Sequence, residues 1–550
     1  MPGSHADRLL RAEGERTVAP DVTEAPETPG RFSSGARPSG SASAPRNWRA
    51  SPWLHGAGLG AIALAVVLRY GLHEYPLQGD RAYFAYLGQA MLRGDPIYPP
   101  FNYPPLATLA AAASMRIGGW FDVPTYLAPR YLGVLVMALS ASTLYGVVRR
   151  ATSSFWPGIL AGLVLIGFSP LAAASISGVE PKGLVVLFTL ATCAALQRRR
   201  WCAAGVATAL AATCFLPALL TVLASMTVIW SAGWPAGRRA AVRYGVGLLL
   251  GALPAAIYLS SADAWGEFWR LAVADMAASR GATAGSQPLR WLEVAARHSR
   301  NELVFFAAGA LGVLWYGTCA LRRGPGRMIR SWAQPCLGGV PALTLLWIGF
   351  SIVDFNGAPD LLPLLPLVAF WAAWATQRLV AFAASQGRRT GDAELPAILV
   401  SILLACTAAY GFADALLYRP AMRLPQQEAL VRAIVEPAGP SGTVVAFNAS
   451  EVYALSERPS PVHPRAVYDV ARRDCPGLIQ DSIAPGPEVV VMLQGRSRRV
   501  FHPCLRRIQF LLLQSGYGLR EIEIPWRDHA SFVPAEGDVW TTTWLVYERR

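Results

Sequence analysis

Apolar runs long enough to cross a lipid bilayer recur along most of this chain. A spanning helix needs about 20 mostly apolar residues, because the hydrocarbon core of a bilayer is about 30 Å thick. Eleven stretches meet or approach this length: 53–72, 128–148, 155–175, 182–197, 201–215, 216–233, 244–260, 303–321, 335–353, 361–384 and 396–417. Only 15% of the residues are charged, against about 25% in an ordinary soluble domain. We therefore predict an all-α polytopic membrane protein with about 11 transmembrane helices.

Arginine clusters follow every second run and predict the topology. They are Arg149 and Arg150; Arg198–Arg200; Arg238, Arg239 and Arg243; Arg322, Arg323, Arg327 and Arg330; and Arg388 and Arg389. Positively charged loops face the cytoplasm. The pattern predicts a multi-pass protein of the cell (plasma or inner) membrane, with a cytoplasmic N-terminus and the C-terminal part outside. It also explains the net charge of +14 without nucleic-acid binding.

The composition divides the chain into three parts. Residues 1–50 have almost no large apolar side chains and are predicted to be a disordered cytoplasmic segment. Residues 51–418 form the membrane domain, with long outer loops at 73–127 and 261–302. The stretch 104–117 is apolar but short, so we expect an interfacial or re-entrant helix there.

Residues 419–550 are more polar and predict a small extracytoplasmic α/β domain. Its expected helices are Gln426–Ile434 and Leu505–Gln514, and its expected strands are Thr443–Phe447, Glu488–Leu493 and Trp544–Glu548. Cys475 and Cys504 are the only cysteines in this part, and outside the cytoplasm they can form a disulfide.

The first outer loop contains the most informative residues. Asp80 comes shortly after the first run, and Tyr83, Phe84, Tyr86, Leu87 and Met91 follow at helical spacing. They predict an amphipathic helix with one apolar stripe, ended by Gly94. Asp80 has two compatible interpretations: a cap at the start of that helix, or a general base that takes a proton from an acceptor hydroxyl at the membrane surface.

The segment GDRAYFAYLGQAMLRGDPIY, with the later YPPL, resembles the first outer loop of GT-C membrane glycosyltransferases. It is most similar to the group that resembles protein O-mannosyltransferases and the aminoarabinose transferase. The shared features are Asp80, the tyrosines, the turn Gly94–Tyr98 and Pro104-Pro105-Leu106. Residues 174–196 resemble the second outer loop, where Glu180 occupies an acidic position. Residues 354–370, which contain Asp354 and Asp360, resemble a late outer loop.

The resemblance implies transfer of a sugar from a polyprenyl-phosphate-linked donor, on the outer membrane face, to an acceptor that is a glycan, a lipid or a protein. Asp80 would be the catalytic base, and Glu180 would orient the acceptor or hold a divalent cation. Arg81 and Lys182 would offset phosphate charge, and Tyr83 and Tyr86 would contact substrate. The family often has a lysine where this chain has Tyr103, and Tyr103 would contact substrate from that position. No cofactor is firmly implied, and a divalent cation stays open because family members differ.

Several other interpretations of the sequence stay open. Glu180 is alternatively a solvated loop carboxylate beside Lys182. The whole protein is alternatively a transporter or flippase of lipid-linked or small solutes, or a non-catalytic membrane scaffold. The acids gather in outer loops, whereas transporters place ionisable residues near the middle of the membrane, so the enzyme is the favoured interpretation.

Overall fold

The computed structural model describes thirteen stretches of the chain and one isolated residue. They are residues 52–69, 71–77, 79–95, 104–231, 233–270, 273, 303–322, 334–353, 358–390, 400–409, 421–461, 475–494, 503–527 and 539–549. Ser51–Arg550 form one compact unit. The predictions for residues 1–50 and for most of the loop 261–302 lie outside the described residues.

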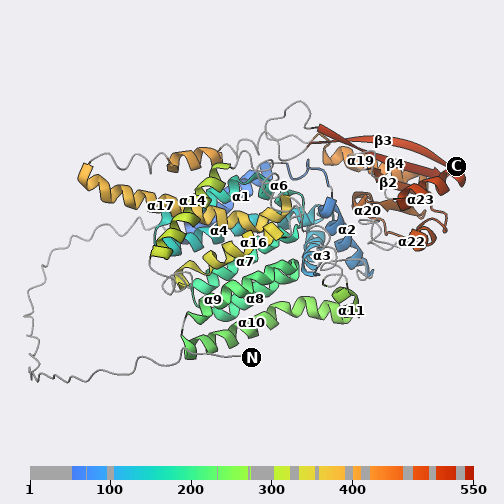
Figure 1. Ribbon diagram of the computed structural model, residues 1–550. Helices are drawn as coiled ribbons and strands as arrows, with labels where there is room; N and C mark the ends of the chain where they lie inside the picture. The colour runs from blue at the N-terminus through green and yellow to red at the C-terminus, as the bar shows by residue number, and fades with distance from the viewer. Residues whose placement is uncertain are drawn as a thin grey trace, which may run out of the picture. The chain divides into compact units, whose positions relative to one another are not determined.

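Each run predicted to span the membrane forms helix over most of the residues that the structure describes (Figure 1). The helices are α1 (Pro52–Arg69), α4 (Ala128–Thr152), α5 (Phe155–Gly167), α6 (Ser169–Ile176), α7 (Pro181–Gln197), α8 (Trp201–Cys214), α9 (Leu220–Trp230), α10 (Trp234–Ser261), α14 (Leu303–Arg322), α16 (Val340–Val353) and α17 (Leu365–Thr390). Residues 400–409 of the last run are also helical. Short helices complete the domain: η2 (Gly119–Phe121), η3 (Leu216–Leu219), α11 (Trp265–Phe268), η5 (Pro335–Leu337) and η6 (Ala358–Leu364).

The number of spans is smaller by a strict length criterion. Among the described helices, four are long and apolar enough to cross a membrane, or five if one bent pair is a single span. The bent pair is α5 and α6, which meet at an angle of 66°. Phe168 is extended between them, and Pro170 lies in the first turn of α6 and supplies no backbone N–H. The run 155–175, predicted as one helix, is therefore broken.

Two α-helices lie between α1 and α4 in the chain: α2 (Gly79–Arg93) and α3 (Leu106–Gly118). The 13 residues of α3 give a length of about 20 Å, too short to span. The helix α2 ends before Gly94, as predicted, but the prediction of a single apolar stripe is wrong. Its residues 82–90 are all buried, because α3 packs on one side of it and α20 (Ser450–Ser456) of the C-terminal domain on another.

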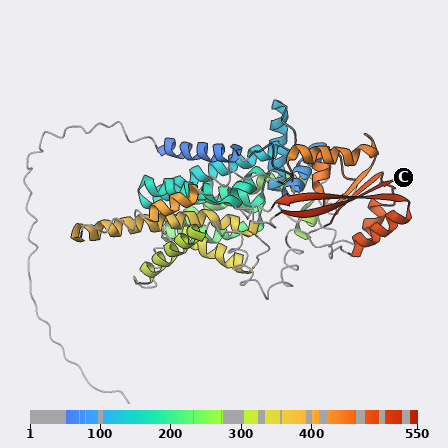
Figure 2. The ribbon, with the colours of Figure 1, turned by 90° about the horizontal axis from the view of Figure 1, so that it is seen from above.

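The C-terminal domain is built on a four-stranded sheet with the order β1-β2-β4-β3. The strands are β1 (Val444–Phe447), β2 (Val489–Gln494), β3 (Tyr517–Arg527) and β4 (Val539–Arg549). β1 and β2 are parallel, and β4 runs antiparallel to both of its neighbours. Figure 2 shows β3 and β4 as the two long red strands. The predicted strands are confirmed, and β3 is an additional one.

Helices cover both faces of this sheet. Side chains alternate along each strand, so Val445 and Phe447 face α22 (Cys475–Ser482) and α23 (Pro503–Gln514). Val444 and Ala446 face α19 (Leu424–Val435) and α20, and their core continues into that of the membrane domain. A short helix, η7 (Glu436–Ala438), comes directly after α19. The sheet and helices expected in the C-terminal part are therefore present, and they share a core with the helical part.

The two cysteines of the C-terminal domain form a disulfide. Cys475 begins α22 and Cys504 lies in the first turn of α23, with their Cα atoms 5.4 Å apart. The expected pairing is thus confirmed, and it ties together the two helices on one face of the sheet.

Candidate functional site

Five charged side chains from three distant segments meet at one end of the helical domain. Asp80 and Arg81 belong to the first turn of α2, Glu180 and Lys182 lie at the start of α7, and Asp360 lies in η6. The cluster thus contains three carboxyl groups and two basic groups.

A tight turn before α7 brings the second segment to the first. Gly178 has a φ of +137°, a conformation that other residues rarely adopt, and the side chain of Arg81 packs beside it. On the opposite side, α4 contacts the same turn through Gly133. A Cβ atom at Gly133 would collide with the carbonyl oxygens of Ser175 and Gly178. The lack of a side chain at Gly133 therefore allows the turn to rest on α4.

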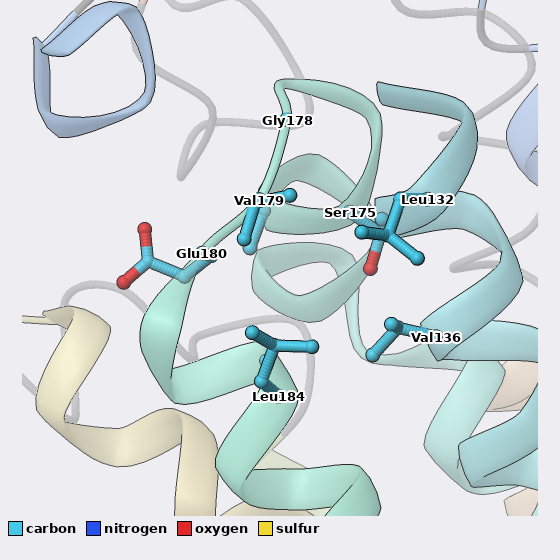
Figure 3. Close-up of a pocket in the computed structure, with 10 residues that line it drawn as sticks. Leu132, Val136, Ser175, Gly178, Val179, Glu180 and Leu184 are labelled. Atoms are coloured by element: carbon cyan, nitrogen blue, oxygen red, sulfur yellow. The ribbon is translucent and has the colours of Figure 1, made fainter. Parts of the chain in front are cut away.

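Glu180 stands immediately before the first helical residue of α7, where Pro181 starts the helix. Its side chain makes no cap hydrogen bond. Instead its Oε2 lies 3.8 Å from the Nε of Arg81. Figure 3 shows the carboxyl group of Glu180 directed away from Leu132 and Val136. Only 7% of Glu180 is exposed, so the alternative of a solvated loop carboxylate is wrong.

Lys182 makes the shortest ion pair of the cluster. Its Nζ lies 2.7 Å from Oδ1 of Asp360 and 5.4 Å from the ring centroid of Phe215. Lys182 is also the only lysine in a chain with 49 basic residues. A compact ammonium group is therefore held between a carboxylate and the face of an aromatic ring, both of which attract a cation.

Burial changes the acidity of both candidate carboxyl groups. It raises the pKa of Asp80, while the positive charges of Lys182 and Arg81 oppose that rise. Burial also raises the pKa of Glu180, and Arg81 and Lys182 again oppose it. Carboxyl groups with a raised pKa hold a proton more readily than exposed ones, as a general base must after it has taken a proton.

The tyrosines named from the sequence lie elsewhere on α2. Tyr83 is buried, with its ring centroid 6.5 Å from that of Phe84. The ring of Tyr86 lies 5.2 Å from that of Tyr453 in the C-terminal domain. Tyr103 lies outside the described residues. The structure therefore brings Asp80, Arg81, Glu180 and Lys182 together and directs Tyr86 to the C-terminal domain.

The charged cluster is not arranged as a metal site. Among the described residues, no three His, Cys, Asp or Glu side chains are placed to hold one ion. In the cluster, the carboxylate of Asp360 is already paired with Lys182, and that of Glu180 lies beside Arg81. These residues do not fit the divalent cation that the resemblance left open.

Two residues near the cluster were not predicted as site residues. Asp360 was recognised only as part of a late outer loop, and nothing in the sequence pairs it with Lys182. Arg130 is fully buried and donates from Nη1 to the carbonyl oxygens of Leu72 and Tyr75. The sequence signal that could have indicated Arg130 was a single arginine near the start of the apolar run 128–148.

No protein-family model and no curated protein matches the chain by sequence. Solved structures match its fold. ArnT from Cupriavidus metallidurans bound to undecaprenyl phosphate aligns with a TM-score of 0.56 at 14% identity, over 90% of this chain and 98% of that one. The oligosaccharyltransferase of Archaeoglobus fulgidus in the apo form gives 0.53 at 12% identity, over 81% and 70%.

A third likeness comes from the same archaeon. AglB in complex with an inhibitory peptide and a dolichol-phosphate aligns at 0.51 with 13% identity, over 80% of this chain and 69% of that one. Each of these three likenesses therefore covers more of the chain than the helical domain alone. The fold of this chain is the GT-C fold that the first-loop motifs implied.

Proposed function

From this GT-C fold, we propose that the chain is a membrane glycosyltransferase that uses a polyprenyl-phosphate-linked sugar as donor. The observation that carries the proposal is the charged cluster of Asp80, Arg81, Glu180, Lys182 and Asp360. Two of the solved structures with this fold hold undecaprenyl phosphate and a dolichol-phosphate, respectively. A basic pair beside carboxyl groups suits a lipid phosphate and a hydroxyl acceptor.

In the proposed reaction, the acceptor hydroxyl oxygen attacks the anomeric carbon of the sugar. The bond from that carbon to the phosphate oxygen breaks, and the polyprenyl phosphate leaves with the electron pair. Asp80 takes the hydroxyl proton as general base. Arg81 and Lys182 offset the negative charge that develops on the phosphate, and Glu180 keeps Arg81 in place through their contact.

In this proposal, the cluster lies on the outer face of the membrane. Glu180 and Lys182 stand at one end of α7, and Arg198–Arg200 come after its other end. Arginine clusters mark the cytoplasmic side, so the site belongs to the opposite side. The Cys475–Cys504 disulfide supports the same assignment for the C-terminal domain, since disulfides persist in oxidising compartments.

The test is sugar transfer by purified protein in lipid vesicles, with a panel of polyprenyl-phosphate sugars and with Asp80→Asn beside the wild type. Asparagine keeps the shape of the side chain but cannot act as a base, so kcat should fall about 100-fold or more. Asp95→Asn is the matched control, because Asp95 lies just after the same helix and pairs with Arg93. It should retain activity within about twofold of the wild type.

The outcomes separate the hypotheses. Equal transfer by wild type and Asp80→Asn would remove Asp80 as the base. Failure of the wild type to transfer any sugar, together with donor-dependent movement of labelled lipid across the vesicle membrane, would favour a flippase. No transfer and no binding of polyprenyl phosphate would leave a scaffold as the better description.

A further inference from the structure

The short segment before α2 sets where Asp80 lies. Residues 72–77 connect α1 to the turn at Gly79, and Asp80 follows in the first turn of α2. The membrane domain holds the first half of this segment through Arg130, whose Nη1 donates to the Leu72 oxygen at 2.9 Å and to the Tyr75 oxygen at 2.5 Å. An arginine that is fully buried and bonded to backbone leaves that half little freedom.

The second half of the segment is held by the C-terminal domain. Gln427 of α19 donates from Nε2 to the carbonyl oxygen of Leu77 at 2.6 Å, and its Oε1 accepts from the Leu77 N–H at 2.8 Å. The backbone N–H of Leu424 also donates to the carbonyl oxygen of Glu74 at 2.8 Å. Gln427 is fully buried, so water does not compete for these bonds.

The same domain contacts α2 further along. Gln89 donates from Nε2 to the carbonyl oxygen of Ala454 at 2.9 Å, and Tyr86 packs on Tyr453. α19 therefore holds the approach to α2, and α20 holds the far half of the helix. Asp80 lies between these two attachments.

We infer that Gln427 is a positioning residue for Asp80, through which the C-terminal domain sets the position of the helix that carries the proposed base. The inference rests on the proposed function only for its catalytic consequence. An amide side chain is uncharged and carries both a donor and an acceptor, so it can bond the N–H and the carbonyl oxygen of one backbone residue. Gln427 thereby satisfies both polar groups of Leu77, three residues before Asp80.

The experiment compares Gln427→Met with Gln426→Met in the full-length protein in lipid vesicles. Methionine has nearly the same length as glutamine but bonds neither group of Leu77. Gln426 is the matched control, because it is the adjacent glutamine, is exposed, and bonds the Arg423 N–H next to its own helix. Gln427→Ala is a second variant, which removes the amide without placing a new side chain beside Leu77.

Two readouts are expected to change together. Hydrogen exchange should become faster in residues 72–93 of Gln427→Met while α19 itself stays protected, and neither should change in Gln426→Met. A displacement of Asp80 by about 1 Å should lower kcat by about 10- to 100-fold, with KM for the donor changed less than about threefold. A purely structural role would instead lower the melting temperature and speed exchange throughout the domain.

The outcomes distinguish this inference from the proposed function. Exchange and kcat equal to those of Gln426→Met would overturn the inference. Faster exchange in 72–93 without any transfer by the wild type would keep the attachment of α2 and overturn its catalytic consequence. If Gln427→Met does not fold, the same comparison is made with Gln427→Ala, and unchanged exchange in 72–93 would again overturn the inference.

Discussion

The Nζ atom of Lys182 lies 2.7 Å from Oδ1 of Asp360, and this ion pair joins the start of α7 to η6. Both side chains are almost completely buried. Removing one partner of such a pair leaves an uncompensated charge out of water, which costs more than the pair itself contributes. The pair therefore fixes the start of α7 and η6 relative to each other around the proposed site.

Breaking this pair should destabilise the protein, and neutralising both partners should restore part of the loss. We expect Lys182→Gln or Asp360→Asn alone to cost about 3–5 kcal/mol, and the double variant to cost less than their sum. The measurement is thermal unfolding of the four proteins in one detergent. Arg93→Gln is the control, because its pair with Asp95 is exposed and is expected to contribute about 0–1 kcal/mol. Additive losses would contradict the pairing.

The single lysine allows a direct test of donor binding. An amine-specific acetylating reagent can modify only Lys182 and the N-terminal amine of this chain. We expect slow modification of Lys182, since only 10% of its side chain is exposed, and slower modification when polyprenyl phosphate covers the ammonium group. Mass spectrometry of the peptide that contains Lys182 measures the rate, and Lys182→Arg gives the blank. Equal rates with and without the lipid phosphate would remove Lys182 from the donor site.

The pH dependence of transfer should follow Asp80. Because burial raises the pKa of Asp80, the proposed base is protonated and inactive up to a higher pH than an exposed aspartate. Transfer should therefore fall as the pH is lowered through that raised pKa. Arg81→Gln removes a charge that lowers this pKa, so the acidic limb of kcat/KM should move to higher pH. Arg93→Gln should leave the limb in place, and a shift to lower pH in Arg81→Gln would contradict the assignment.

Glu451 in α20 should make the stability of the protein depend on pH. Only 3% of Glu451 is exposed, and burial raises its pKa from 4.5 to about 7. The folded state then binds more protons than the unfolded state between these two values. The contribution of Glu451 to the free energy of unfolding is therefore largest below pH 4.5 and falls as the pH rises. Above pH 7 this contribution is about 3 kcal/mol smaller.

Substitution of Glu451 by glutamine should remove this loss. Glutamine is neutral at every pH, so Glu451→Gln should raise the melting temperature at pH 8 and have little effect at pH 4.5. Glu521→Gln, on an exposed strand residue, is the control and should change neither. A Glu451→Gln protein that melts at the wild-type temperature at pH 8 would contradict this prediction, because burial of the Glu451 carboxylate would then not destabilise the folded protein.

The helices and most strands were predictable because their signals are local. The long apolar runs indicate where helices form, and short apolar runs rich in valine indicate strands such as β1 and β2, which are covered by helices on both faces. The strand β3 escaped prediction because it forms an edge of the sheet and contains Arg520, Glu521, Glu523 and Pro525. Polar residues and proline are tolerated at a sheet edge, and in sequence they resemble a surface loop.

The site was predictable only in part. Asp80 and Glu180 could be proposed from short motifs around them, but which groups surround them depends on long-range packing. Nothing near Lys182 or Asp360 indicates that they meet, and Gln427 is one of two adjacent glutamines with opposite environments. The burial of α2 on all sides was not predicted, because α20, one of the two helices that pack on it, belongs to the distant C-terminal part of the chain.

The bonds between Gln427 and Leu77 join residues 350 positions apart in the chain. At a synthesis rate of about 5–20 residues per second, roughly 20–70 s separate the production of these two residues on the ribosome. Asp80 is therefore made early and acquires its final support late, after α19 has been synthesised. Under the proposed function, a nascent chain would therefore lack the last support of its proposed base until α19 has been made.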